Sequence, residues 1–496
     1  MARTHAFATI LFFSLFSAVP AYAQTAPAPA QAAAPAAPVT HPANALEAVQ
    51  QGRQMLQDIL AARLKQAKQP YRVANANSAK ITLAVWQRKT GDIAIVEAVK
   101  TGTDLAITSG PKLPIRVAYS AKLSSRYELP AEADALVVGV IYPVTEKKAV
   151  AKRKYVYEAT DTVYVPYSPA FYLPEMLSSG SDYLSFLIQD AYDELRAKGI
   201  RSRAFPDKLL ADVIDPYLVK TIAVIEHSDN ASFLAEDESE STVGRFLVKL
   251  ATNRDAAFDA SISNAGAAGL VQFIPSTYAL MVKKRPDLGL IPDFRTGMAD
   301  HRNAVKAQVA YLDMDLAGMD DVRRLYLTDK ARAAEYLAAS YNGGSIRVKR
   351  ASAAFGDDWS APHRAELARL QSTAAALKKR IAKLQKQTGK EAKAALVKAR
   401  SERETAVGRI ALLQRSALRQ ETVDYVVKLR LAYAMFTAGY FATPRAPSGA
   451  LPALAAATAP APDAAPQQPD APAQVAAAPQ KTGPICFDDG GCAATD

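Results

Sequence analysis

The chain has 496 residues, more than one ordinary hydrophobic core accommodates, so two or more domains are expected. Its net charge of +11 does not indicate a nucleic-acid binder, because residues 361–420 alone hold 15 Lys and Arg against 4 Asp and Glu. The five His are scattered and only two Cys are present, so a zinc site is not expected, and no metal or cofactor is predicted.

Residues 1–23 have the pattern of a secretory signal peptide. Arg3 precedes an apolar stretch from Ala6 to Val19, and Ala21-Tyr22-Ala23 provides small residues for cleavage near Ala23. No later segment is long and apolar enough to be a membrane span, so we expect an exported protein without a transmembrane segment. Residues 24–43, rich in Ala and Pro, are predicted to be a disordered leader.

Residues 44–180 are predicted to form a helix followed by a small β-rich domain. The helix is expected over Leu46 to Lys65. Short runs of β-branched and aromatic residues, separated by turns, then occupy residues 80–166 and indicate strands. No polar cluster suited to chemistry stands out among them, so we expect a scaffold or a partner-binding domain.

Residues 181–360 carry a helical pattern and are predicted to form the main α-helical domain. Asp182 to Lys198 shows the periodicity of one amphipathic helix. Asp215-Pro216 opens another, because Asp is a good N-cap and Pro fits the first helical position.

Residues 361–420 have the heptad pattern of two helices. Apolar residues step by three and four from Leu367 to Leu384 and again from Leu396 to Ala417, on either side of Gln387-Thr388-Gly389-Lys390. The pattern predicts an antiparallel coiled-coil hairpin inserted before a closing helix at 421–442. Its basic residues are typical of a solvated coiled-coil face, and the alternative is adhesion to anionic envelope polymers, to a membrane surface or to a partner helix.

The C-terminal part is predicted to lack a fold of its own. Residues 443–484 are rich in Ala, Pro and Gln and read as a disordered tether. Residues 485–496 form a short tail in which Cys486 and Cys492 bracket five residues. In an oxidising compartment these thiols most simply close a disulfide loop, and two free thiols are the alternative.

Glu226 is the first candidate for acid chemistry. Val219, Ile222, Ala223 and Glu226 fall at i, i+3, i+4 and i+7, so the carboxyl lies on the buried stripe near the end of its helix. Burial disfavours the charged form and raises the pKa, and a neutral carboxylic acid near pH 7 can protonate a leaving oxygen. The alternative is a boundary Glu that reaches water.

Two later segments give this Glu a context. The run Ser263 to Tyr278 contains GAAG, whose small residues suit the floor of a groove for a flat polymer, and then a Gln and a Pro-Ser-Thr helix start. Ser340-Tyr341-Asn342-Gly343-Gly344 closes a later helix. A Glu at a helix end followed by GAAGLVQFIPSTY and ASYNGG resembles the soluble lytic transglycosylase family of lysozyme-like enzymes. The resemblance covers about Asp207 to Phe355 and resumes at Glu421 to Val426.

The resemblance implies a fold, an activity and a set of site residues. It implies an α+β multidomain chain with an all-α lysozyme-like catalytic domain, located in the periplasm. The implied reaction cleaves the MurNAc–GlcNAc β-1,4 bond of peptidoglycan without water and leaves 1,6-anhydroMurNAc ends. By the same resemblance Glu226 is the single acid and then base, Tyr341 lies against its carboxyl, and the residues that bind substrate or shape its site are Ser263, Gly266, Gln272, Tyr341, Asn342 and Tyr425.

Two departures from the family pattern leave alternatives open. Glu226 lies 40 positions before Gly266, farther than in most members, and residues 229–253 read as an insertion with an acidic run at Glu236 to Glu240. Asp255 stands where the usual spacing would put the acid, although its side chain is short for that task. His227 and His301 are expected to support packing or hydrogen bonding.

Three functions are therefore compared. The first is a lytic transglycosylase, the second a goose-type-lysozyme-like hydrolase on the same fold, and the third an inactive wall-binding scaffold. Peptidoglycan strands are the expected partner, and an envelope protein could dock on the β-rich domain or on the basic hairpin.

Overall fold

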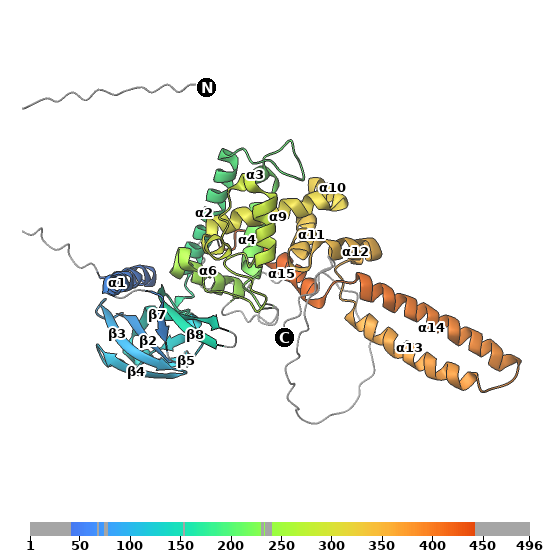
Figure 1. Ribbon diagram of the computed structural model, residues 1–496, viewed down its shortest axis with the longest axis horizontal. Helices are drawn as coiled ribbons and strands as arrows, with labels where there is room; N and C mark the ends of the chain where they lie inside the picture. Colours follow the sequence, from blue (N-terminus) through green and yellow to red (C-terminus); the bar gives the residue numbers. More distant parts are fainter. Residues whose placement is uncertain are drawn as a thin grey trace, which may run out of the picture. The chain divides into compact units, whose positions relative to one another are not determined.

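The computed structural model describes residues 41–66, 69–73, 78–151, 154–229, 233 and 241–441 (Figure 1). The predicted signal peptide, nearly all of the Ala/Pro leader, the tether after residue 442, both Cys residues and the acidic run lie outside these residues.

The N-terminal domain is an antiparallel sheet covered by one helix, in agreement with the predicted helix plus β-rich domain (Figure 1). Helix α1 spans Ala45–Gln66, and six strands form the main sheet in the order β1-β8-β7-β2-β3-β4. A separate pair is made by β5 and β6. The strand bounds are β1 Tyr71–Val73, β2 Ser78–Gln87, β3 Ile93–Thr101, β4 Asp104–Ser109, β5 Arg116–Tyr119, β6 Arg126–Glu128, β7 Ala135–Ala151 and β8 Lys154–Tyr164.

Both faces of this sheet are packed near its centre. On one face Val49 and Leu56 of α1 join Trp86 and Val138 in a buried cluster, and on the other Leu83 belongs to a second cluster. Alternation along β8 puts Ala159 and Val163 into buried positions, and it leaves Thr160, Thr162 and Tyr164 on the opposite face.

The following domain is helical. Its helices are α2 Pro174–Ala197, α3 Leu210–Val213, α4 Pro216–Ile225, α6 Thr242–Asn253, α7 Pro275–Lys284, α8 Phe294–Ala299, α9 His301–Gly318, α10 Asp320–Thr328, α11 Lys330–Gly343, α12 Ser345–Phe355 and α15 Gln420–Thr437. One large apolar cluster joins most of them, α15 included.

The start of the helical domain differs from the prediction. Helix α2 begins at Pro174, so the expected boundary at residue 181 falls inside it. Gly180, a poor helix former, lies inside α2, and a Cβ there would lie 2.0 Å from the carbonyl oxygen of Leu247. The glycine allows α6 to approach the backbone of α2 closely, which the sequence pattern does not reveal.

Helix α6 also corrects the predicted insertion at residues 229–253. Ten of its residues are buried, and Val248 and Ala251 join the apolar cluster under α1. At its end Asn253 donates from Nδ2 to the carbonyl oxygen of Val165 at 3.0 Å and accepts from the amide of Val165 at 2.8 Å. The second half of the supposed insertion is therefore a core helix that joins the sheet domain to the helical domain.

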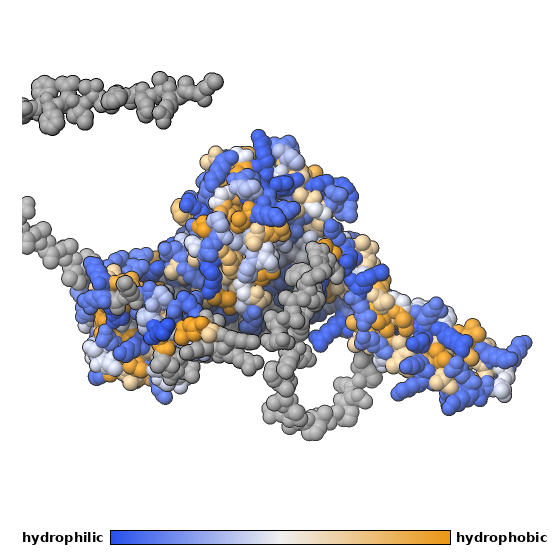
Figure 2. All heavy atoms as spheres, in the orientation of Figure 1, coloured by the Kyte–Doolittle hydropathy of each residue, from blue (hydrophilic) through white to orange (hydrophobic). Residues whose placement is uncertain are grey.

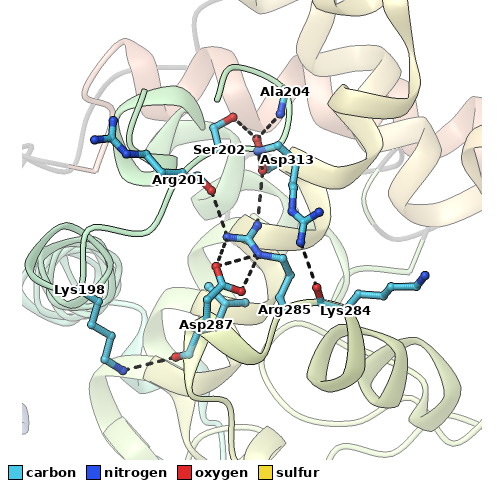
Figure 3. A network of polar contacts seen from close by, with 10 residues as sticks. Lys198, Arg201, Ser202, Ala204, Lys284, Arg285, Asp287 and Asp313 are labelled. Atoms are coloured by element: carbon cyan, nitrogen blue, oxygen red, sulfur yellow. Dashed lines mark hydrogen bonds and ion pairs between the residues drawn. The ribbon is translucent and has the colours of Figure 1, made fainter. Parts of the chain in front are cut away.

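A buried arginine fixes the segment after α7. Figure 3 shows the guanidinium of Arg285 between Asp287 and Asp313, and it donates from Nη2 to the carbonyl oxygen of Arg201 at 3.1 Å. Asp313 is fully buried on α9 and also accepts a hydrogen bond from the amide of Arg203 at 2.6 Å. A buried charge is tolerated only with such partners.

Two long helices lie between α12 and α15. Helix α13 spans Arg364–Leu384 and α14 spans Lys390–Ser416, and they lie side by side (Figure 1). Leu377, Ala399, Ala406 and Leu413 are buried, and Arg409 makes a two-pronged ion pair with Glu366 at 2.8 and 3.2 Å. Hydrophilic side chains cover much of the visible surface of both helices (Figure 2). Of the helices that the structure describes, none is both long and apolar enough to cross a membrane.

Candidate active site

The end of helix α4 presents Glu226. The side chain of Asp215 accepts from the amide of Tyr217 at 2.9 Å, so the predicted N-cap before Pro216 is confirmed. Val219, Ile222 and Ala223 are buried, and Glu226 follows as the C-cap residue with a half-buried side chain. The helix thus carries the carboxyl to the edge of the core, where protein surrounds it and one part still reaches solvent.

Helix α15 supplies the groups that contact this carboxyl. Tyr425 donates a hydrogen bond from its buried hydroxyl to Oε1 of Glu226 at 2.6 Å. One turn later the buried Lys428 donates to the carbonyl oxygens of Ser228 and Ile225 at 2.8 and 3.3 Å. A cation on the last carbonyls of a helix is favourable, so Lys428 holds the end of α4 in place.

The electrostatics of Glu226 are set by opposed effects. Burial raises its pKa to about 7, although the Tyr425 hydrogen bond and the charge of Lys428 each lower it. The negative charge of Glu421 acts in the same direction as burial. A pKa near neutrality leaves both the acid and the carboxylate populated, which is what a group that first gives and then takes a proton requires.

The segment from Ser261 to Phe273 folds on itself. Ser263 is exposed, its Oγ accepts from the amide of Ala267 at 3.0 Å, and Gly266 turns the chain with φ +79°. Gln272 adopts φ +50°, and its Nε2 donates to the carbonyl oxygen of Gly269 at 2.9 Å. The predicted groove segment is therefore a tight loop, in which the Ser263 hydroxyl accepts one turn contact and keeps its O–H as a donor.

The end of α11 lies between that loop and α15. Tyr341 donates from its hydroxyl to the carbonyl oxygen of Val271 at 2.6 Å, and burial, followed by the charge of Glu226, raises its pKa well above the usual value. Asn342 accepts from the hydroxyl of Thr422 at 2.8 Å. Tyr341 is thus near the carboxyl, but the tyrosine that bonds to it is Tyr425.

The two histidines have structural partners. His227 stacks on Phe258 with ring centroids 3.9 Å apart, and its Nε2 lies 3.0 Å from the carbonyl oxygen of Leu270. Burial lowers its pKa to about 3, so the ring is neutral and its Nε2 carries the proton toward that carbonyl. His301 similarly contacts the carbonyl oxygen of Ala257 at 2.7 Å.

Asp255 does not share the surroundings of Glu226. Its side chain is 89% exposed and lies 3.8 Å from Nη2 of Arg53 on α1. The geometry therefore favours Glu226 over Asp255 as the acid.

One comparison with known proteins finds a family for part of the helical domain. Residues 245–360 match the family model of the transglycosylase SLT domain. This segment, about a quarter of the chain, supports a lytic transglycosylase, lysozyme-like family. Searches of the curated proteins and of the solved structures found no match.

The SLT match covers only part of the site. The loop with Ser263, Gly266 and Gln272 lies inside it, as do Tyr341 and Asn342. Glu226 and Tyr425 lie outside it, on helices that pack against the SLT helices. No group of His, Cys, Asp or Glu that could hold a metal occurs within the described part of the chain.

Sequence reasoning missed Lys428 and Thr422. Both lie on α15 at helical spacing from Tyr425, and Thr422 bonds to Asn342 of α11 while Lys428 bonds to the end of α4. The only signal in the sequence was this spacing, since Thr422, Tyr425 and Lys428 at i, i+3 and i+6 occupy one face of a helix.

Proposed function

We propose that this protein is a peptidoglycan lytic transglycosylase that cleaves the MurNAc–GlcNAc β-1,4 bond and leaves a 1,6-anhydroMurNAc end. The SLT domain supports activity on peptidoglycan in general. The observation that carries the finer proposal is the carboxyl of Glu226, bonded by Tyr425 at 2.6 Å and with a pKa of about 7.

The proposed reaction uses this one carboxyl twice. Neutral Glu226 protonates the glycosidic oxygen, the bond from C1 of MurNAc to that oxygen breaks, and GlcNAc leaves with its 4-hydroxyl. The C6 hydroxyl of the same MurNAc attacks C1 and gives its proton to the Glu226 carboxylate, which restores the acid. Because the nucleophile is part of the substrate, the second step gains the advantage of an intramolecular reaction.

Tyr425 and Lys428 stabilise the carboxylate between the two steps. The hydrogen bond from Tyr425 and the charge of Lys428 both favour the ionised form, while burial favours the neutral form. The balance keeps the pKa of Glu226 near neutrality, so neither proton transfer is strongly uphill.

A hydrolase of the goose-type kind is the second candidate function. Attack by water in an inverting reaction needs a second carboxylate to activate it. Glu146 and Asp259 line a groove that also contains His227, the residue after Glu226. Glu146 lies 3.4 Å from Arg295, and this leaves Asp259 as the carboxyl to test.

Product analysis distinguishes these functions. Purified sacculi are digested with the mature protein, and the released muropeptides are analysed by mass spectrometry. We expect anhydro ends with wild type and with Asp259→Asn, and no release with Glu226→Gln. Reducing ends would instead establish a hydrolase, and the absence of any product would favour an inactive wall-binding scaffold.

The proposal places the protein in the periplasm, with a signal peptide cleaved near Ala23. Peptidoglycan is its substrate, and an envelope protein is a further partner to be sought on the sheet domain or on α13 and α14. Periplasmic fractionation and N-terminal sequencing of the mature chain test the location.

A further inference from the structure

A groove of about 680 Å³ lies between strands β7 and β8 of the sheet and the start of the loop from Ser261 to Phe273. The sheet contributes Val144 of β7 with Thr160, Thr162 and Tyr164 of β8, and the helical domain contributes Phe258 and Ser261. The β8 residues alternate along the strand and so share one face, with Val144 paired to Thr160. The volume and the mix of hydroxyl and apolar groups are those of a ligand site.

This groove adjoins the loop from Ser261 to Phe273. Nε2 of Gln272 donates to the carbonyl oxygen of Ser261 at 3.4 Å, and Ser261 lines the groove. His227 also lines it and follows Glu226 directly in the chain. A ligand in the groove would therefore lie beside the segment that we expect to hold the glycan.

Two lysines, Lys122 and Lys249, line this groove, and Lys249 is the less exposed of them. Lys249 of α6 lines both the groove and a smaller adjoining cavity of about 200 Å³, together with His227 and Phe258. Its ammonium forms no hydrogen bond or ion pair with any residue that the structure describes. Burial and the charge of Arg245 lower its pKa. Asp229 also lines the smaller cavity but forms no ion pair with Lys249. A half-buried cation without an ion-pair partner is costly, so an anionic ligand here would gain a charge-assisted contact.

The other charges of the groove differ from Lys249, and the remaining lysine, Lys122, is exposed to solvent. Glu146 has Arg295 as an ion-pair partner at 3.4 Å, and Asp259 adds a second carboxyl on the rim. A ligand with a carboxylate and an ammonium group matches Lys249 and Asp259 together. Sugar rings supply neither charge, whereas the peptides attached to peptidoglycan strands supply both.

We propose that the groove between β7, β8 and α6 binds the peptide of a peptidoglycan strand, with a peptide carboxylate on Lys249. The inference rests on the proposed function and adds the substrate class: peptide-bearing strands rather than bare glycan. The sheet domain then takes part in substrate selection.

Binding measurements on the full mature chain test this site. Isothermal titration in the Glu226→Gln background compares a disaccharide-tetrapeptide, the same compound with amidated carboxylates, and a GlcNAc tetramer. Lys249→Met is expected to weaken binding of the tetrapeptide compound at least about tenfold, because a hydrogen bond to a charged group contributes about 1.5–3 kcal/mol. Binding of the amidated compound and of the GlcNAc tetramer should not change.

Two variants control this measurement. Lys249→Arg keeps the charge and should retain most of the affinity. Lys283→Met removes an exposed lysine of α7 and should leave every affinity unchanged. Lys249→Met is expected to fold, since it removes a poorly solvated charge, and thermal unfolding checks this.

Three outcomes would overturn the peptide site. The first is an unchanged affinity of Lys249→Met for the tetrapeptide compound. The second is an equal loss of affinity for all three compounds. The third is that a peptide-free strand with a free lactyl carboxylate loses as much affinity in Lys249→Met as the tetrapeptide compound does. Product analysis of sacculi separates this failure from failure of the enzyme proposal. If anhydro products form but binding does not depend on Lys249, only the peptide site is refuted. If binding depends on Lys249 but no anhydro products form, only the proposed activity is refuted.

Discussion

The two sides of the candidate site are built in different ways. The loop from Ser261 to Phe273 is shaped by its own backbone contacts, such as the hydrogen bond from Gly266 N to Ser263 O at 2.9 Å. The contact between Glu226 and Tyr425 joins residues 199 positions apart and exists only because α15 packs against α4. The loop should therefore respond to changes in backbone freedom, and the carboxyl to changes in helix packing.

Removal of the acid is the largest expected effect on the carboxyl side. Glu226→Gln should lower turnover of sacculi by at least about 10²-fold, since general acid–base catalysis contributes about 10²–10⁴. The rate of release of anhydro muropeptides measures this. An active Glu226→Gln together with an inactive Asp255→Asn would show that the acid is misassigned.

The same variant should be more stable at alkaline pH. The pKa of Glu226 is raised from 4.5 to about 7 in the folded state, so wild type loses stability as pH rises through this range, while the Gln variant does not. At about 1.4 kcal/mol for each pH unit, the gain in the free energy of unfolding has a ceiling of about 3 kcal/mol above pH 7. It should vanish below about pH 4.5. Urea unfolding at several pH values measures it, and a gain of equal size at every pH would contradict ionisation of the buried carboxyl as its cause.

The loop from Ser261 to Phe273 should be destabilised by a substitution that restricts its backbone. Gly269 has φ +72°, and a Cβ there would lie 2.4 Å from the carbonyl oxygen of Met298. Gly269→Ala is therefore expected to cost about 2–5 kcal/mol of unfolding free energy, from left-handed backbone strain and overpacking. Gly266→Ala is the matched control, because its φ is +79° but the nearest atom to a Cβ lies 3.8 Å away. Equal losses in the two variants would show that close approach is not the reason for Gly269.

The hydrogen bond from Tyr425 of α15 to Glu226 should affect the pH dependence of kcat/KM. Tyr425→Phe removes a hydrogen bond that lowers the pKa of Glu226, so the alkaline limb of kcat/KM should move to higher pH. We expect a fall of about tenfold in kcat as the carboxylate loses a donor. Tyr433→Phe is the control, since its hydroxyl bonds to Asp215 at the other end of α4. Tyr433→Phe should lower the free energy of unfolding without shifting the alkaline limb of kcat/KM.

The sequence predicted what is encoded locally. The helix start at Asp215, the buried stripe that leads to Glu226 and the longer strands of the sheet domain follow from residue types a few positions apart. The short strand β1 lies before the predicted stretch at residues 80–166. The spacing between Glu226 and Gly266 predicts an insertion at residues 229–253, whereas the apolar face of α6 packs on α2 and α1, partners that its own sequence does not identify. For the same reason Lys428 was missed, and the contact with the carboxyl was expected from Tyr341.

Deletion of α13 and α14 tests whether the position of α15 depends on the segment that precedes it. Arg364–Arg419 is deleted and the ends are rejoined by a short Gly/Ser link, which leaves α15 intact from Gln420. The pair has its own buried residues, and Arg409 pairs with Glu366 within it, so activity on soluble glycan chains should change less than about threefold. An unshifted alkaline limb would show that Tyr425 still bonds to Glu226. Conversely, a deletion variant that fails to fold would make the pair part of the core, and the position of α15 would then depend on more than its contacts with α4 and α11.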